Sequence, residues 1–294
     1  MKTIKSLALS VLTLSAFGQI APPPAADSLP FITVMESIAT DRPDRSSTAR
    51  TVPVGWLQYE GGYQFSRDQV ISSLETNTNT HQVDELLRFG INERFEIRAH
   101  IYAASELKDQ PQLAVEPVRF TGVRPTSVGF KYNIARAGNW SPEVSWLSEL
   151  SMPWLAYGDF RVPTQGNMMF QQQTLLIEKS LPYGLALTTN VGVAGTLTPN
   201  GGLINSGLFT LSASYSGYGF GLYAEYYSNW TITTNRIYGT PYVNTGIFKN
   251  LSNDLKLDLY AGLDLSPYMN TVTQSSGYFI GTGISYRLPI AQYL

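Results

Sequence analysis

From residue 53 onward, apolar and polar side chains alternate along most of the chain. The segment "LKLDLYAGLDL", residues 255–265, places apolar residues at every second position and Lys256, Asp258 and Asp264 between them. Successive side chains of a β-strand point to opposite faces of a sheet, whereas a helix repeats every 3.6 residues. The pattern therefore predicts strands with one apolar face and one polar face.

The same alternation recurs in segments of about ten residues throughout this part of the chain. The twelve predicted strands are 54–66, 81–90, 94–103, 126–134, 143–152, 168–179, 184–194, 206–216, 219–229, 240–249, 255–265 and 276–288. Long and short connections alternate between them, with 67–80 and 104–125 among the long ones. This order is typical of an up-and-down meander with tight turns at one end and long loops at the other.

Two all-β folds fit such strands: a transmembrane barrel and a secreted antiparallel sandwich. Only 14% of the residues are charged, whereas about a quarter is usual in a soluble domain. Aromatic residues such as Trp56, Tyr226 and Tyr286 stand near strand ends, as in the aromatic girdles of membrane barrels. We therefore predict a transmembrane up-and-down antiparallel β-barrel of about 12 strands, with short periplasmic turns and long external loops. The sandwich is the alternative.

The first 52 residues differ from the rest. Residues 1–18 combine Lys2 and Lys5 with a short apolar run and a small-residue site, which predicts a signal peptide. Residues 19–52 are rich in Pro and charge without periodicity, which predicts an irregular N-terminal arm, and residues 53–294 form the expected barrel. A barrel with a signal peptide is expected in the bacterial outer membrane, with membrane lipid and the barrel assembly machinery as partners.

The composition narrows the chemistry. The chain has no Cys, which excludes thiolate metal sites and thiol nucleophiles. A net charge of −2 gives no reason to expect nucleic acid binding. We expect no cofactor and no metal. The two histidines, His81 and His100, leave open a barrel hydrolase with a luminal His, but a polar luminal network explains His100 without catalysis.

If the apolar faces contact lipid, the polar faces surround a hydrated lumen. The predicted pore-lining residues are Glu60, Glu96, Arg98, His100, Lys131, Glu149, Glu225, Lys256, Asp258 and Asp264. These charges either line a passage and set its selectivity, or pair with each other and only stabilise a filled barrel.

The N-terminal arm offers a candidate plug. Asp41, Arg42, Asp44 and Arg45 stand close together around a proline. We expect them to fold into the periplasmic mouth and to pair with luminal charges such as Glu60 or Arg98. The alternative is a solvated flexible tail.

Several segments resemble a known bacterial family. "TDRPDRSSTARTVPVGWLQYEGGYQFSRD", followed by "LLRFGINERFEIR", is similar to the start of the outer-membrane transporter family of the meta-pathway of phenol degradation. "SVGFKYNI" and "SPEVSWLSELSMP" fit as well. The resemblance implies an outer-membrane β-barrel that passes small molecules, with aromatic or other hydrophobic compounds among the candidate solutes. It leaves the substrate open.

Together these features predict an outer-membrane channel or transporter for passive uptake or efflux of small molecules, without enzymatic activity. A non-transporting structural or adhesive barrel is the first alternative. A barrel hydrolase with a luminal His is the second.

Overall fold

The alternating segments form the strands of a closed barrel. A computed structural model of the chain describes residues 37–43, 45–71, 75–113, 115–161, 169–197, 203–232, 237–268 and 274–290. The expected signal peptide (1–18) and Asp44 lie outside the described residues, so the signal peptide stays a prediction. The strands are β1 (Trp56–Ile71), β2 (Glu75–Asn92), β3 (Phe95–Asp109), β4 (Val118–Val123), β5 (Thr126–Ala135), β6 (Glu143–Met152), β7 (Tyr157–Gly158), β8 (Met169–Ser180), β9 (Leu185–Leu197), β10 (Leu203–Gly217), β11 (Phe220–Ile232), β12 (Ile237–Asn250), β13 (Leu255–Asp264) and β14 (Gln274–Pro289).

Closure of the sheet comes from the first and last long strands. β1 pairs antiparallel with β14 from Trp56↔Pro289 to Ile71↔Gln274, and its other edge pairs with β2. Within the described residues, twelve strands form the ring, in which each strand pairs with its sequence neighbours once β4 and β7 are set aside. The predicted all-β barrel of about 12 strands is confirmed, and the sandwich alternative is wrong.

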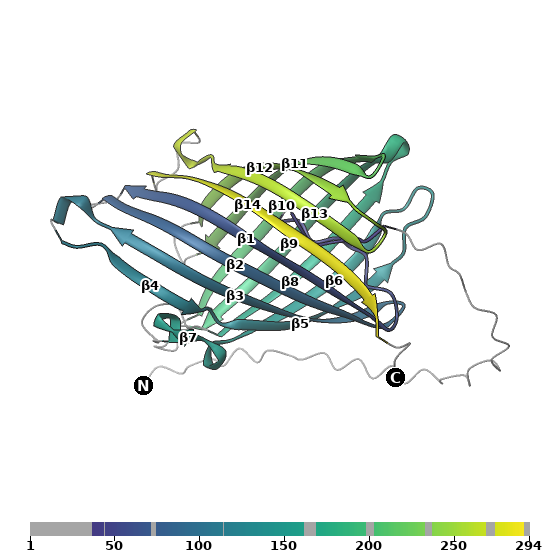
Figure 1. Cartoon of the computed structure of the whole chain (residues 1–294), viewed down its shortest axis with the longest axis horizontal. Helices are drawn as coiled ribbons and strands as arrows, with labels where there is room; N and C mark the ends of the chain where they lie inside the picture. The colour runs from purple at the N-terminus through teal and green to yellow at the C-terminus, as the bar shows by residue number, and fades with distance from the viewer. Residues whose placement is uncertain are drawn as a thin grey trace, which may run out of the picture. The chain divides into compact units, whose positions relative to one another are not determined.

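Short connections gather at one end of the barrel. β10 and β11 are joined by Tyr218 and Gly219, whose φ angles are 53° and 76°. Positive φ at both central residues is the requirement of a type I′ hairpin turn, which suits the twist of the flanking strands. β1 begins and β14 ends at this tight-turn end, as Figure 1 shows.

The other end carries the longer connections and the short helices. 3-10 turns occur at η1 (Pro111–Leu113), η2 (Pro153–Leu155), η3 (Asp159–Arg161) and η6 (Ser266–Tyr268), while η5 (Pro182–Gly184) belongs to a tight turn. No helix in the described part of the chain is long and apolar enough to cross a membrane.

The two faces of the wall differ as the alternation predicts. In β13, Leu259 is 48% exposed on the outer face, whereas Asp258 is 4% exposed on the inner face. The outer face also carries Ile97, Leu187 and Ile280, all largely exposed. Exposed aliphatic side chains on every side of a closed sheet form a continuous apolar surface, which lipid covers at no cost in hydrophobic free energy.

Strands at the long-loop end run further than expected. The segment 67–80 is mostly strand, because β1 extends to Ile71 and β2 starts at Glu75, and the expected loop 104–125 contains β4. Beyond the lipid both faces of a strand meet water, so apolar residues no longer mark alternate positions. Alternation therefore underestimates these strands, although Thr76, Thr78 and Thr80 favour them by β-propensity.

The lipid-facing assignment predicts a depth-dependent cost for a buried charge. Leu259→Arg, at the middle of β13, should lower the free energy of unfolding by about 2–4 kcal/mol, and Leu255→Arg, next to the tight turn, by about 0–1 kcal/mol. Urea unfolding in lipid vesicles measures both. Equal costs at the two positions would contradict a hydrocarbon environment for the middle of the strand.

Candidate functional site

The N-terminal arm, residues 37–52, lies inside the barrel at the tight-turn end, where Figure 1 shows it as the dark purple segment. An irregular segment in a lumen must find partners for its backbone N–H and C=O groups. Here the inward side chains of the strands supply them. Gln58 donates to the Ala39 carbonyl at 2.8 Å, Lys131 to the Thr48 carbonyl at 2.8 Å, and Glu96 accepts from the Val52 N–H at 2.8 Å.

Asp41 is the centre of the arm's electrostatics. Its carboxylate lies 2.7 Å from Arg98 Nη1, 3.3 Å from Lys131 Nζ and 3.5 Å from Arg88 Nη1. Its backbone N–H donates to Glu60 Oε2 at 2.8 Å. Burial alone would raise the pKa of Asp41, but the charges of Arg88, Lys131 and Arg98 outweigh it and hold that pKa well below its usual range.

Arg88 connects this centre to the wall. It is 1% exposed and forms a bidentate pair with Glu96, with Nε and Nη2 each 2.9 Å from a carboxylate oxygen. Nη1 donates to Glu60 at 2.9 Å, and Nη2 donates to the Arg50 carbonyl at 3.0 Å. Glu60 and Glu96 are fully buried, so Arg88 is the ion-pair partner of two buried carboxylates and holds the arm as well.

A second group of contacts surrounds Arg42. Its guanidinium lies 2.5 Å from Asp84 and 3.5 Å from Asp258, and its carbon Cζ lies over the Tyr260 ring, 5.6 Å from the ring centre. Gly62 and Gly283 make this position available, because a Cβ at either residue would overlap the guanidinium. The burial of Arg42 opposes its charge, but Asp84 and Asp258 raise its pKa above the usual value.

A third contact fixes the middle of the arm to the opposite wall. Ser46 donates to Glu225 Oε1 at 2.6 Å, and the Arg45 N–H donates to Glu225 Oε2 at 2.9 Å. The Ser46 hydroxyl also lies 2.6 Å from that of Thr210, and Asn244 donates to Glu225 at 2.6 Å. The arm therefore bridges the lumen from β2 and β3 to β10 and β11.

The last part of the arm is held near the tight turns. Glu178 accepts from the Thr48 hydroxyl at 2.5 Å and lies 3.1 Å from Arg50 Nε. Ala49 is fully buried against Leu147 and Leu176, the two buried leucines on the inner face of β6 and β8. This small apolar contact orients the chain where it turns toward β1.

The structure places the ten predicted pore-lining residues on the inner face of the wall. Those that contact the arm directly are Glu60, Glu96, Arg98, Lys131, Glu225, Lys256 and Asp258. Glu149 lies 3.2 Å from Arg98, and His100 bonds the Tyr102 hydroxyl at 2.9 Å. Asp264 is apart from the others, near the long loops, where it accepts from Ser266 and Ser275. Whether these residues line a conducting passage stays a prediction.

Three of the four plug candidates are described, and the fourth, Asp44, is not. Asp41 and Arg42 make the ion pairs above, and the contacts of Asp41 include Glu60 and Arg98, the two luminal partners expected from the sequence. The Arg45 guanidinium instead lies over the Tyr227 ring, 5.8 Å from its centre.

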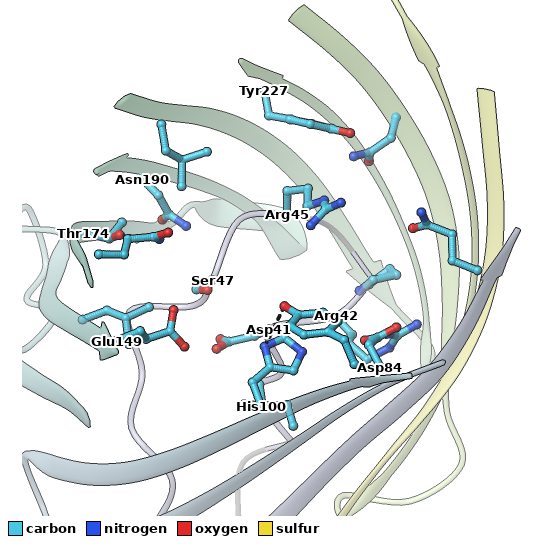
Figure 2. A pocket seen from close by; sticks show the side chains of 18 of the residues that line it. Asp41, Arg42, Arg45, Ser47, Asp84, His100, Glu149, Thr174, Asn190 and Tyr227 are labelled. Carbon is cyan, nitrogen blue, oxygen red and sulfur yellow. Dashed lines mark hydrogen bonds and ion pairs between the residues drawn. The ribbon is translucent and has the colours of Figure 1, made fainter. Parts of the chain in front are cut away.

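The arm separates two luminal cavities. One of about 290 Å³ lies on the long-loop side and is bordered by Arg45, His100 and Tyr227. Figure 2 shows it, with Asp41, Arg42, Asp84 and His100 on one side and Thr174, Asn190 and Glu149 on the other. The second, of about 200 Å³, lies among residues next to the tight turns, such as Ser216 and Asn250. Arg42 and Pro43 border both cavities.

Two important luminal residues, Arg88 and Asp84, were missing from the sequence-based set. In "DELLRFG" two leucines are adjacent, so the sequence does not show which alternate positions face the lumen. Leu86 is in fact buried inside the barrel. Counting every second residue from Gln82 would have placed Asp84, Leu86 and Arg88 on the same face as Gln82. The register confirms this face, because Arg88 lies opposite Gln58 and Arg98.

The histidines show little that suggests catalysis. His100 and His81 each contact a tyrosine hydroxyl, at 2.9 Å and 2.6 Å. Across the described ranges neither imidazole is hydrogen-bonded to a carboxylate that could orient it as a base. No group of three or more His, Cys, Asp or Glu residues in those ranges is arranged to hold a metal ion.

Comparisons with known proteins identify the fold. The chain is similar to the crystal structure of the COG4313 outer membrane channel from Pseudomonas putida F1, with a TM-score of 0.61, 12% sequence identity, and coverage of 82% of this chain and 98% of that one. It is also similar to the translocator domain of autotransporter NalP from Neisseria meningitidis, with a TM-score of 0.51, 10% identity, and coverage of 79% and 88%. At such identity the likeness establishes an outer-membrane β-barrel fold.

No protein-family model matches the chain, and no curated protein matches it at a significant level. The resemblance to the meta-pathway phenol-degradation family therefore stays a prediction.

The position of Asp41 predicts a large effect of a neutral replacement. Asp41→Asn removes one of the carboxylates that Arg88, Arg98 and Lys131 contact, and loss of one partner of a buried ion pair costs about 3–5 kcal/mol. Hydrogen exchange in residues 37–52 should therefore accelerate by about 100-fold or more. Ser37→Ala, outside the ion pairs, is the control and should leave the rates unchanged. Full protection in Asp41→Asn would contradict this role of Asp41.

The lowered pKa of Asp41 also predicts how the arm responds to acid. In a released arm Asp41 would titrate near pH 4, and its pKa is lower in the docked arm. The contribution of Asp41 to docking is therefore fully present above about pH 4 and is progressively lost as the pH falls further. A nitroxide on Ser37→Cys, in a chain without other cysteines, should become more mobile only below about pH 4. Release already at pH 6 would contradict this assignment.

Proposed function

We propose that this protein is an outer-membrane channel through which small molecules pass by diffusion, and that its N-terminal arm restricts the passage. The apolar outer face, the charged and polar inner face and the fold shared with an outer membrane channel of P. putida support this proposal. The observation that carries it is the position of the arm between two luminal cavities, with Arg42 and Pro43 in the wall of each.

The way the arm is held suits a segment that moves. Its contacts to the wall are mainly hydrogen bonds and ion pairs, whereas the buried apolar residues of its described part are Ile38, Ala49 and Val52. When the arm leaves, water can solvate the exposed charges, so the polar contacts are exchanged for hydration. The barrel itself keeps its complete ladder of strand pairs, because the arm belongs to no strand.

The long-loop cavity also bears on the solute. Its lining combines hydrogen-bonding groups such as Asn190 and Thr174 with the rings of Tyr227, Tyr260 and Phe279. A volume of about 290 Å³ is at the small end of the range for ligand pockets. Small solutes with an aromatic or apolar face and a polar group are the proposed class, in line with the family resemblance.

The alternatives are less well supported. A purely structural or adhesive barrel gives no reason for cavities on both sides of a polar, exchangeable arm. A hydrolase needs an oriented base beside a nucleophile, and the contacts of His100 and His81 are to tyrosine hydroxyls. We therefore assign no enzymatic activity to the protein.

Single-channel recording in planar bilayers tests the proposal. We expect the wild type to conduct weakly and deletion of residues 37–50 to raise the single-channel current several-fold, because the arm's side chains leave the narrowest part of the lumen. Deletion of residues 20–34 is the control, since it keeps every described arm contact.

The outcomes separate the two parts of the proposal. Equal currents from the wild type and the 37–50 deletion would show that the arm does not restrict the passage. No current from either protein, with both folded as judged by heat-dependent gel mobility, would show that the barrel is not a channel.

A further inference from the structure

The outer surface of the barrel carries a cationic niche at the long-loop end of β1 to β4. Its cavity has a volume of about 310 Å³, and Arg67 and Arg119 are the charged residues in its lining, which contains no Asp or Glu. Asn79, His81 and Ser105 add hydrogen-bonding groups between them. We refer to this cavity as the outer niche.

Strand register explains why these residues share one face. Arg67 lies opposite Asn79, Asn79 opposite Leu107, and Leu107 opposite Arg119. Residues directly opposite each other in neighbouring strands point to the same side of the sheet. The two arginines therefore stand at the two sides of the outer niche, three strands apart, at roughly 14 Å between their Cα atoms.

Neither arginine of the outer niche has an ion-pair partner among the residues that the structure describes. Both are exposed. Arg119 donates only to the Ser105 hydroxyl, at 3.1 Å. By contrast, exposed Arg136 at the tight-turn end lies 2.7 Å from Glu93. Two unpaired guanidinium groups facing one cavity attract an anion that can contact both.

The place of the outer niche relative to lipid identifies the source of that anion. The row of the outer niche nearest the tight turns is Phe65, His81 and Ser105. Two residues further toward those turns, the same face carries Tyr63, Val83 and Ala103, which belong to the apolar outer surface. The Tyr63 hydroxyl contacts His81 at 2.6 Å, and the Phe65 ring packs against His81 at 5.1 Å. Tyrosines in this position mark the level of lipid headgroups. The outer niche therefore lies where headgroup phosphates of the external leaflet would be.

We infer that the outer niche binds the phosphorylated sugar headgroup of lipid A, the glycolipid of the external leaflet. Arg67 and Arg119 contact its phosphates, because guanidinium groups match phosphate oxygens in bidentate geometry. Asn79 and Ser105 contact sugar hydroxyls, and the rings of Phe65 and Tyr278 form the apolar floor under the sugar. The inference rests on the outer-membrane location in the proposed function, with the long loops outside, and is independent of conduction.

Binding of defined lipids to the purified full-length protein in detergent tests the inference. Native mass spectrometry compares bisphosphorylated lipid A, monophosphorylated lipid A and phosphatidylglycerol on the wild type. Arg67→Gln/Arg119→Gln removes both charges of the outer niche. Arg94→Gln/Arg136→Gln removes two exposed charges at the tight-turn end and is the matched control. The single variants Arg67→Gln and Arg119→Gln serve if the double variant fails to fold.

We expect the wild type to bind bisphosphorylated lipid A about tenfold or more tightly than phosphatidylglycerol. Arg67→Gln/Arg119→Gln should lose about tenfold or more of this affinity, since each arginine makes a charge-assisted contact. The control variant should stay within twofold of the wild type. Equal binding of lipid A and phosphatidylglycerol, or a double variant within twofold of the wild type, would overturn the inference.

Conductance measured on the same preparations separates this inference from the proposed function. Arg67 and Arg119 lie outside the lumen, so their replacement should leave the single-channel current unchanged. A protein that conducts but does not prefer lipid A refutes the outer niche alone, whereas one that binds lipid A through these arginines but does not conduct refutes the channel alone.

Discussion

Every part of this structure depends on the need to pair backbone and charged groups wherever water is scarce. In hydrocarbon the strands can satisfy their N–H and C=O groups only by closing the sheet, which the long β1–β14 pairing achieves. The same need reappears inside the lumen. There an irregular arm has no strand to pair with, and its backbone is satisfied instead by side chains that the wall points inward. One requirement thus explains both the barrel and the course of the arm.

The luminal charges of the wall hold the arm in place. Buried ion pairs contribute little net stability, because desolvation offsets most of the attraction, but loss of one partner is costly. Glu60, Glu96 and Arg88 are already paired within the wall, and Asp41 adds a counter-charge to a site where Arg88, Arg98 and Lys131 converge. The wall therefore presents a cluster of positive charge where the carboxylate of the arm binds, and the positions of these charges determine where the arm docks. Such an interface can exchange for water while exposing little apolar surface, which suits a segment that restricts a passage reversibly.

Much of the fold follows from the alternation of residues, and the exceptions have physical reasons. The twelve strands and the inward direction of Glu60, Lys131 and Asp258 are readable because a lipid-facing side must be apolar. The ends of β1 and β2 at the long-loop side cannot be read from the alternation, because both faces of the strands meet water there. Arg88 escaped detection because Leu86 is apolar and yet faces the lumen, where it lies opposite Glu60 and His100. The sequence could suggest that Asp41 pairs with luminal charges, but the convergence of three cations on it requires strand register, which no single segment contains.

The most direct test of this account compares two neighbouring positions of β13. The chain has no cysteine, so fluorophores can be placed singly at Asp258→Cys and Leu259→Cys in protein reconstituted into vesicles with nitroxide-labelled acyl chains. The account predicts strong quenching at position 259 and little at position 258, because only the former faces lipid. Equal protection of both positions from the lipid quencher, in a protein that stays dispersed without detergent, would contradict it.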